Sequence, residues 1–138
     1  MMFHTFKSCL GFLACLLGCC AAVDASPVLR CHFEVNAERV EHSFLPVSEP
    51  YEVPSVNLAN RFRFKAVVLG DQTRVDLINL YVSYQTQRQP MLLQHVKFVA
   101  PVAQTHPMPE SLTGRVALYS PFLGKELLYG CALYEVKP

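Results

Sequence analysis

The chain has no tryptophan, and its six glycines stand singly rather than in clusters. A phosphate-binding loop needs several glycines close together, so the sequence argues against nucleotide binding of that kind. No G-x-S-x-G segment and no run of like charges is present. The formal net charge is only +1 and the pI is about 7.6, whereas nucleic-acid-binding domains usually have a pI above about 9. We therefore expect neither an enzyme, nor a bound cofactor, nor a nucleic-acid partner.

Apolar side chains are abundant, at 51% of the 138 residues, while charged residues make up 17%. This composition is sufficient to bury a core, and the length indicates a single domain. Beyond the N-terminal segment the apolar residues alternate with polar ones and show no sustained period of 3.6. Period-two alternation predicts strands that have one buried and one solvated face.

Four of the six cysteines lie in the first twenty residues. This segment has one positive charge at Lys7, then the uncharged residues 9–23, then small residues at Val23 and Ala25. Such an order is typical of a secretory signal, and an apolar run of fifteen residues is shorter than the roughly twenty that a membrane span needs. We predict cleavage between Ala25 and Ser26. The product would be a secreted or periplasmic domain of residues 26–138, with no membrane span after cleavage.

A second interpretation concerns the same segment. Leu16-Leu17-Gly18-Cys19 resembles the lipobox of bacterial lipoproteins, in which the cysteine is lipidated. Lipidation at Cys19 would leave an odd number of other cysteines, which is unfavourable in an oxidising compartment. An envelope lipoprotein anchored at Cys19 is therefore the alternative, and cleavage after Ala25 is preferred.

Only Cys31 and Cys131 remain in the predicted mature domain. Oxidising compartments form and keep disulfides, so a Cys31–Cys131 bridge is the expected state. A reactive thiol would normally have a basic neighbour, and Cys131 lies between Gly130 and Ala132.

The alternation predicts an antiparallel β-sandwich or small barrel of six or seven strands. The absent tryptophan and the single, widely spaced cysteine pair argue against an antibody-type immunoglobulin domain. The expected strands cover residues 28–35, 38–45, 61–69, 72–84, 91–100, 112–119 and 126–136. For the pair 61–69 and 72–84 we predict a two-residue turn at Gly70-Asp71, with Lys65 opposite Asp76.

Two groups of side chains are candidate binding residues. Arg61, Arg63 and Lys65 share one strand face, with Arg74 predicted on the neighbouring strand, and these cations could bind an anionic ligand. The second group comprises the turn aromatics Tyr51, Tyr119 and Phe122, which are candidates for contact with a protein partner.

A metal site is the weaker possibility. His106-Pro107-Met108 resembles the H-x-M triplet of β-sandwich copper chaperones of the periplasm, and its soft ligands would suit Cu(I). The resemblance ends at these residues, because Met91 lies only fifteen positions before His106. We therefore expect a non-catalytic binding or structural module for an unidentified protein or envelope ligand, with a copper-binding protein as the alternative.

Overall fold

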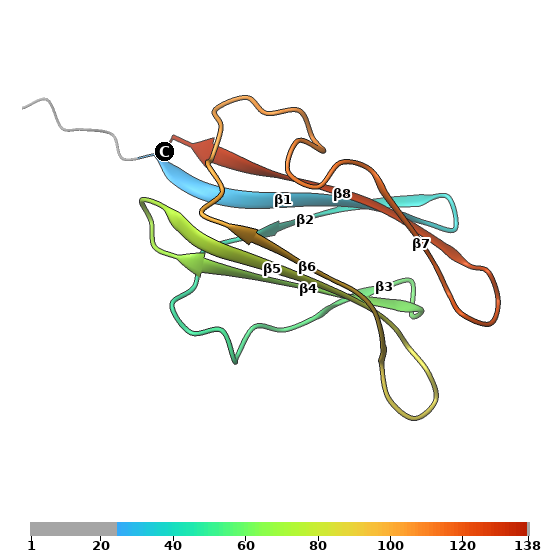
Figure 1. Cartoon of the computed structure of the whole chain (residues 1–138). Helices are drawn as coiled ribbons and strands as arrows, with labels where there is room; N and C mark the ends of the chain where they lie inside the picture. The colour runs from blue at the N-terminus through green and yellow to red at the C-terminus, as the bar shows by residue number, and fades with distance from the viewer. Residues whose placement is uncertain (1–24, 138) are drawn as a thin grey trace, which may run out of the picture.

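The computed structural model describes residues 25–137, which form two antiparallel four-stranded β-sheets stacked face to face (Figure 1). The strands are β1 (Ser26–Val35), β2 (Glu38–Phe44), β3 (Val56–Leu58), β4 (Phe62–Gly70), β5 (Val75–Tyr84), β6 (Met91–Val99), β7 (Val116–Tyr119) and β8 (Glu126–Val136). The sheet orders are β2-β1-β8-β7 and β3-β4-β5-β6. The all-β prediction is confirmed, and the architecture is that of a sandwich. Within residues 25–137 no helix is long and apolar enough to cross a membrane.

Strand β1 follows the alternation of its sequence. Leu29, Cys31, Phe33 and Val35 are buried, and the side chains between them are partly exposed. β1 lies between β2 and β8, so its backbone is paired on both edges. Because alternate side chains point to opposite faces of a sheet, one set packs against the second sheet and the other meets solvent.

Aromatic side chains from both sheets join at the centre of the sandwich. Phe33 of β1 and Tyr129 of β8 pack against Phe64 of β4, with ring centroids 4.7 and 5.4 Å from that of Phe64. All three side chains are at most 1% exposed. The hydroxyl of Tyr129 donates to Oε1 of Gln94 on β6, and burial raises the pKa of Tyr129 to about 12. The core therefore contains one hydrogen bond that links the two sheets.

Strands β4 and β5 form the expected hairpin, but the predicted register is wrong. Their connection is the four-residue segment 71–74 rather than a two-residue turn, and Gly70 pairs with Val75. Lys65 consequently lies opposite Tyr81 and not opposite Asp76.

The side chain of Asp71 explains the longer turn. Its Oδ1 accepts hydrogen bonds from the backbone N–H groups of Thr73 at 2.7 Å and Arg74 at 3.0 Å, and from the Thr73 hydroxyl at 2.6 Å. Asp and Asn side chains commonly form such local turns, which compete with the tighter Gly-X hairpin. A bulge follows, and Asp76 forms an ion pair with Arg74 at 3.1 Å in place of the predicted pair with Lys65.

The same hydrogen bonds make this turn sensitive to acid. They lower the pKa of Asp71 from 3.8 to about 2, because the Thr73 hydroxyl and the two backbone N–H groups favour the ionised carboxylate. The unfolded chain therefore takes up the proton first as the pH falls. We expect the contribution of Asp71 to stability to be complete above pH 3.8 and to be lost as the pH falls through about 2. An NMR titration of its carboxyl carbon tests this, and a midpoint at 3.8 would contradict it.

Two other segments differ from the sequence pattern. The pattern does not predict β3, a three-residue strand that pairs with the start of β4 and brings the number of strands to eight. The predicted strand 112–119 is shorter, since β7 begins only at Val116. The preceding residues turn onto the edge of β8 instead, where the N–H of Leu112 donates to the carbonyl oxygen of Cys131 at 3.0 Å.

Candidate functional site

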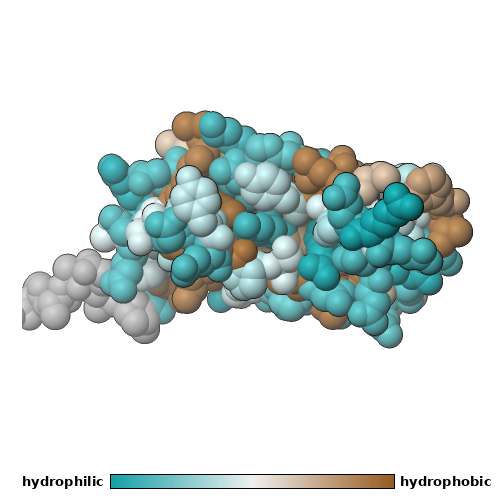
Figure 2. Space-filling model, turned by 90° about the horizontal axis from the view of Figure 1, so that it is seen from below, coloured by the Kyte–Doolittle hydropathy of each residue, from teal (hydrophilic) through white to brown (hydrophobic). Residues whose placement is uncertain are grey.

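The outward positions of β4, β5 and β6 form a continuous surface on the second sheet. They make four cross-strand rows, which are Arg63–Ser83–Leu92, Lys65–Tyr81–His95, Val67–Asn79–Lys97 and Leu69–Leu77–Val99. These twelve positions hold one arginine, two lysines and one histidine, and no carboxylate. We call this surface the cationic face. Figure 2 views the molecule from below, the side of β4 and β5 in Figure 1, and shows hydrophilic and neutral side chains with small, separate hydrophobic groups.

The centre of the cationic face is an ordered row of side chains. The ring of Tyr81 stacks on the imidazole of His95, with centroids 4.4 Å apart and an interplanar angle of 6°. Nε2 of His95 donates to Oδ1 of Asn79 at 3.0 Å, which fixes the plane of the imidazole. Lys65 lies directly across from Tyr81 on the next strand. A flat aromatic surface is thus held beside an ammonium group.

The connection between β2 and β3 adds an aromatic rim. The N–H of Val47 donates to the carbonyl oxygen of Val68 at 2.8 Å, and the N–H of Gly70 donates to the carbonyl oxygen of Val47 at 3.2 Å. These two hydrogen bonds fix the connection to the edge of β4. Tyr51 follows and is 87% exposed. A hollow of about 270 Å³ lies between the connection and the sheet and is lined by Pro50, Tyr51, Lys65, Val67, Asn79 and Tyr81. Its lining combines one cation, two aromatic rings and apolar carbon.

The structure brings together three of the four predicted cations. Arg61, Arg63 and Lys65 follow at two-residue spacing along one side of β4, and the carbonyl oxygen of Arg61 extends the ladder by accepting from the N–H of Gln85 at 2.7 Å. Arg74 lies in the turn at the other end of the hairpin, level with Asp71 and therefore six residues, or about 20 Å, along β4 from Lys65. Its guanidinium is paired with Asp76, so Arg74 does not belong to the same site.

Sequence reasoning missed three members of this surface, Tyr81, His95 and Lys97. Their own strands show the alternation that puts them outward. The wrong hairpin register hid their neighbours, however, because it placed Asp76 rather than Tyr81 beside Lys65.

The predicted partner-contact aromatics are all exposed but lie apart. Tyr51 borders the cationic face, whereas Tyr119 and Phe122 belong to the β7–β8 hairpin of the other sheet and are 58% and 75% exposed. Only Tyr51 therefore shares a site with the predicted cations.

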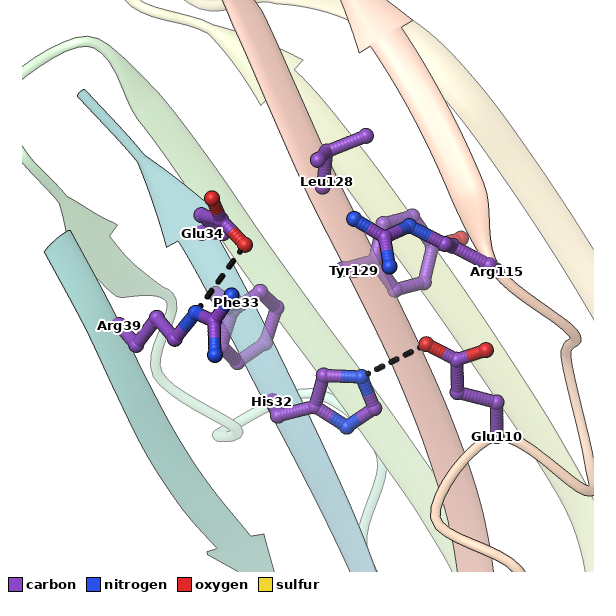
Figure 3. Close-up of a pocket in the computed structure, with 8 residues that line it drawn as sticks. All are labelled: His32, Phe33, Glu34, Arg39, Glu110, Arg115, Leu128 and Tyr129. Atoms are coloured by element: carbon purple, nitrogen blue, oxygen red, sulfur yellow. Dashed lines mark hydrogen bonds and ion pairs between the residues drawn. The ribbon is translucent and has the colours of Figure 1, made fainter. Parts of the chain in front are cut away.

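A second hollow, of about 180 Å³, lies on the outer face of the β2-β1-β8-β7 sheet (Figure 3). Nε2 of His32 donates to Oε1 of Glu110 at 3.0 Å, and Arg39 donates to Glu34 at 3.2 Å. Arg115 reaches in from the same loop as Glu110. Two carboxylates and two guanidiniums balance each other here, so this hollow has no excess of either charge.

Gly130 allows the approach of the loop that carries Glu110. It lies directly opposite His32 in the sheet. A Cβ atom at this position would be 2.6 Å from Cγ of Glu110 and 3.0 Å from Cε1 of His32. The hydrogen bond between His32 and Glu110 therefore crosses β8 at the residue that has no side chain.

The two residues of the copper alternative lie in the connection between β6 and β7. His106 is exposed and Met108 is 78% exposed. Over residues 25–137 no three side chains of His, Cys, Asp or Glu are grouped so that they could hold a metal ion. Copper binding stays a prediction.

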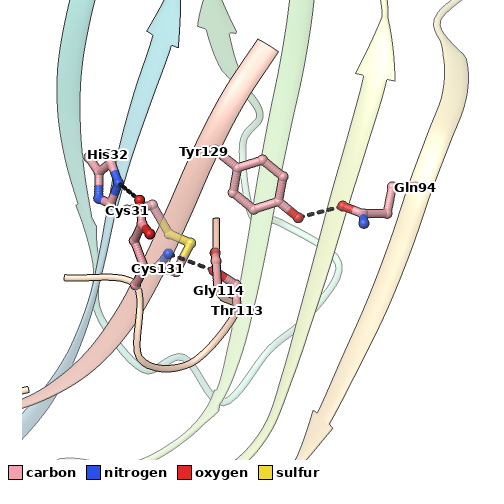
Figure 4. Close-up of a disulfide and its surroundings, with 8 residues drawn as sticks. Cys31, His32, Gln94, Thr113, Gly114, Tyr129 and Cys131 are labelled. Atoms are coloured by element: carbon pink, nitrogen blue, oxygen red, sulfur yellow. Dashed lines mark hydrogen bonds and ion pairs between the residues drawn. A yellow bond between two sulfur atoms is a disulfide. The ribbon is translucent and has the colours of Figure 1, made fainter. Parts of the chain in front are cut away.

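The predicted disulfide is confirmed (Figure 4). Cys31 and Cys131 lie directly opposite each other on β1 and β8, and both side chains are fully buried. The N–H of Cys131 donates to Oγ1 of Thr113 at 2.9 Å, and its carbonyl oxygen accepts from Leu112. The bridge therefore links two central strands of one sheet, and the β6–β7 loop covers the free side of β8 at this point.

The predicted cleavage site lies at the start of the described chain. Ser26 is the first residue of β1 and pairs with Val136 of β8. The apolar segment and Cys19 lie outside the described residues, so signal cleavage and lipidation both stay predictions.

Comparison of the chain with protein-family models, curated proteins and solved structures gives no match. The fold and the bridge define its class as a small disulfide-bridged all-β domain of sandwich architecture.

Proposed function

We propose that this chain is an exported, non-catalytic module that binds an anionic partner through its cationic face. The observation that carries the proposal is the arrangement of Arg63 and Lys65 on β4 and of His95 and Lys97 on β6, on either side of β5, with no carboxylate in the four cross-strand rows. Rows of fixed cations raise the local concentration of anions and orient them as they approach.

The distribution of charge over the whole domain supports this proposal. Residues 61–99 contain six Lys and Arg side chains and two carboxylates, whereas the other described residues contain five and eight. A chain that is almost neutral overall is therefore positive on one sheet and negative on the rest. Such a polarised surface presents one face to an anionic partner and disfavours the opposite orientation.

The surroundings of His95 support a binding role rather than a catalytic one. Its imidazole donates to the amide oxygen of Asn79 and stacks on Tyr81. A catalytic imidazole is usually oriented by a carboxylate and lies within reach of a nucleophile. At this position the ring instead extends a flat surface on which a planar or apolar part of a ligand can rest.

Removal of two cations from this face tests the proposal. We expect R63Q/K65Q to elute from a carboxylate cation-exchange matrix at clearly lower salt than the unmodified domain. Salt screens contacts between exposed charges, and the variant has two fewer cations on this face to hold it to the matrix. The control K125Q/K137Q removes the same charge from residues outside the cationic face. Equal shifts for the two double variants would show that retention follows net charge alone, and the proposal would be wrong.

Export needs a separate measurement. We expect the intact mass from the soluble envelope or culture fraction to correspond to a chain that starts at Ser26 and gains about two mass units on reduction. A membrane-bound species that starts at a lipid-modified Cys19 would make the protein a lipoprotein. An uncleaved chain with free thiols would contradict export.

A further inference from the structure

Strand β6 is the long exposed edge of the second sheet. It covers Met91–Val99, contains no proline, and pairs only with β5. The other edge of this sheet is the three-residue β3, and the first sheet ends in the four-residue β7 and in β2. The pairing of β6 with β5 is irregular between Leu92 and Gln94 but regular from Gln94 to Val99. A regular edge segment of this length is a template for a further strand.

The register shows which backbone groups of β6 are free. The N–H of Ala100 donates to the carbonyl oxygen of Asp76 at 2.8 Å, which makes 76 and 100 a hydrogen-bonded pair. Because such pairs alternate in antiparallel sheets, Gln94, Val96 and Phe98 face β5. The N–H and C=O groups of residues 95, 97 and 99 therefore point to the open edge. Within residues 25–137 these outward-pointing groups form no hydrogen bond.

The same three residues belong to the cationic face. The side chains of His95 and Lys97 point outward from the sheet, in the rows that contain Lys65 and Asn79 respectively. A strand added along β6 would place every second side chain directly across from them, at the distance of an ordinary cross-strand pair. Acidic residues fit those positions, because opposite charges across strands are favourable and like charges are not.

The alternate positions of an added strand meet a different environment. On the inner side of β6, Val96 and Phe98 are only partly buried, and Phe98 packs against the core. Apolar side chains on the new strand would cover these two residues. The fitting segment therefore alternates acidic with apolar residues.

We propose that β6 accepts an extended polypeptide segment of alternating acidic and apolar residues as an antiparallel fifth strand of the β3-β4-β5-β6 sheet. The inference rests on the proposed function in that it names the partner of the cationic face. Main-chain hydrogen bonds supply much of the affinity in this mode of recognition, and alternate side chains supply its specificity. A second copy of this chain fits less well, because its own β6 would bring cationic residues to a cationic face.

The peptide acetyl-Glu-Val-Glu-Val-Glu-Val-Glu-amide, labelled with a fluorophore, is the probe, and anisotropy with the mature domain is the readout. In an antiparallel pair the residues that share the face of His95 and Lys97 are those whose amides bond to β6. N-methylation of the glutamates should therefore weaken binding at least about tenfold, whereas N-methylation of the valines should change it by less than about twofold. Equal binding of both methylated peptides and the parent would overturn the proposal.

A protein variant tests the same edge. Val99→Pro removes an N–H that points to the open edge and donates no hydrogen bond to β5. Edge strands tolerate proline at such a position. This substitution should weaken peptide binding at least about tenfold. Ala117→Pro is the matched control. The backbone N–H of Ser120 donates to the carbonyl oxygen of Lys125 on the β8 side. Because the direction of the N–H groups alternates along a strand, the N–H of Ala117 points away from β8. If Val99→Pro does not fold, the methylated peptides decide the question.

The outcomes separate this proposal from the proposed function. If K65Q/K97Q loses binding of the peptide and N-methylation has no effect, the proposed function of the cationic face is supported and strand addition is excluded. A strong effect of N-methylation without any effect of the charge variant would support strand addition and remove the electrostatic role. Sedimentation that shows a dimer disrupted by Val99→Pro would identify a second copy as the occupant and overturn the proposal.

Discussion

Replacing both Cys31 and Cys131 by alanine is expected to lower the free energy of unfolding by about 4–5 kcal/mol, since the bridge joins residues 100 positions apart. In the chain-entropy model this loss reflects the larger number of conformations that the unfolded chain gains when a long loop opens. Domains of this size are stable by about 5–15 kcal/mol, so the bridge contributes a substantial share. Urea unfolding of the double variant and of the reduced wild type should give similar midpoints, both below that of the oxidised protein.

The burial of the bridge provides an independent check on this prediction. Both side chains are fully inaccessible in the folded domain, so a thiol reductant reaches the sulfurs only after the structure opens. Reduction should therefore be slow in buffer and fast in denaturing urea. An unchanged unfolding midpoint after complete reduction would show that the bridge does not stabilise the domain.

Phe64→Ala is expected to cost about 3–5 kcal/mol, a typical effect for a fully buried phenylalanine. Phe64 is 0% exposed and contacts Phe33 and Tyr129 of the opposite sheet, so its removal leaves a cavity at the junction of the two sheets. Thermal unfolding followed by circular dichroism measures the loss.

Two further variants bracket this effect. Phe64→Leu keeps most of the volume and should cost only about 1–2 kcal/mol. Phe122→Ala removes an aromatic ring that is 75% exposed and should change stability by less than about 0.5 kcal/mol. A loss for Phe64→Ala no larger than that for Phe122→Ala would contradict the packing described here.

Local alternation predicted those parts of the fold in which one strand has one buried face. The inward set of β1 and that of β8 follow directly from their sequences, and with them the position of both cysteines. The same reasoning placed Arg63 and Lys65 on an outward face, because their neighbours Phe62 and Phe64 are apolar.

The register of a hairpin and the contacts between distant segments could not be predicted in the same way. The register of the β4–β5 hairpin depends on which of two local turns prevails, and the hydrogen bonds of the Asp71 carboxylate outweigh the Gly-X preference. The hydrogen bond between His32 and Glu110 joins residues 78 positions apart and forms because the β6–β7 loop folds back over Gly130. The sequence pattern of neither segment predicts this contact.

The place of the bridge also determines how the domain would respond to mechanical force. A pull on Ser26 and Val136 would separate β1 from β8 pair by pair, starting at the end where these two residues face each other. After five pairs the opening would reach Cys31 and Cys131 and stop. Beyond that point the covalent S–S bond would carry the load, and the chain between the two cysteines would bear no tension. The domain would thus yield by roughly 35 Å, given about 3.5 Å per extended residue, and keep the rest of its structure under load.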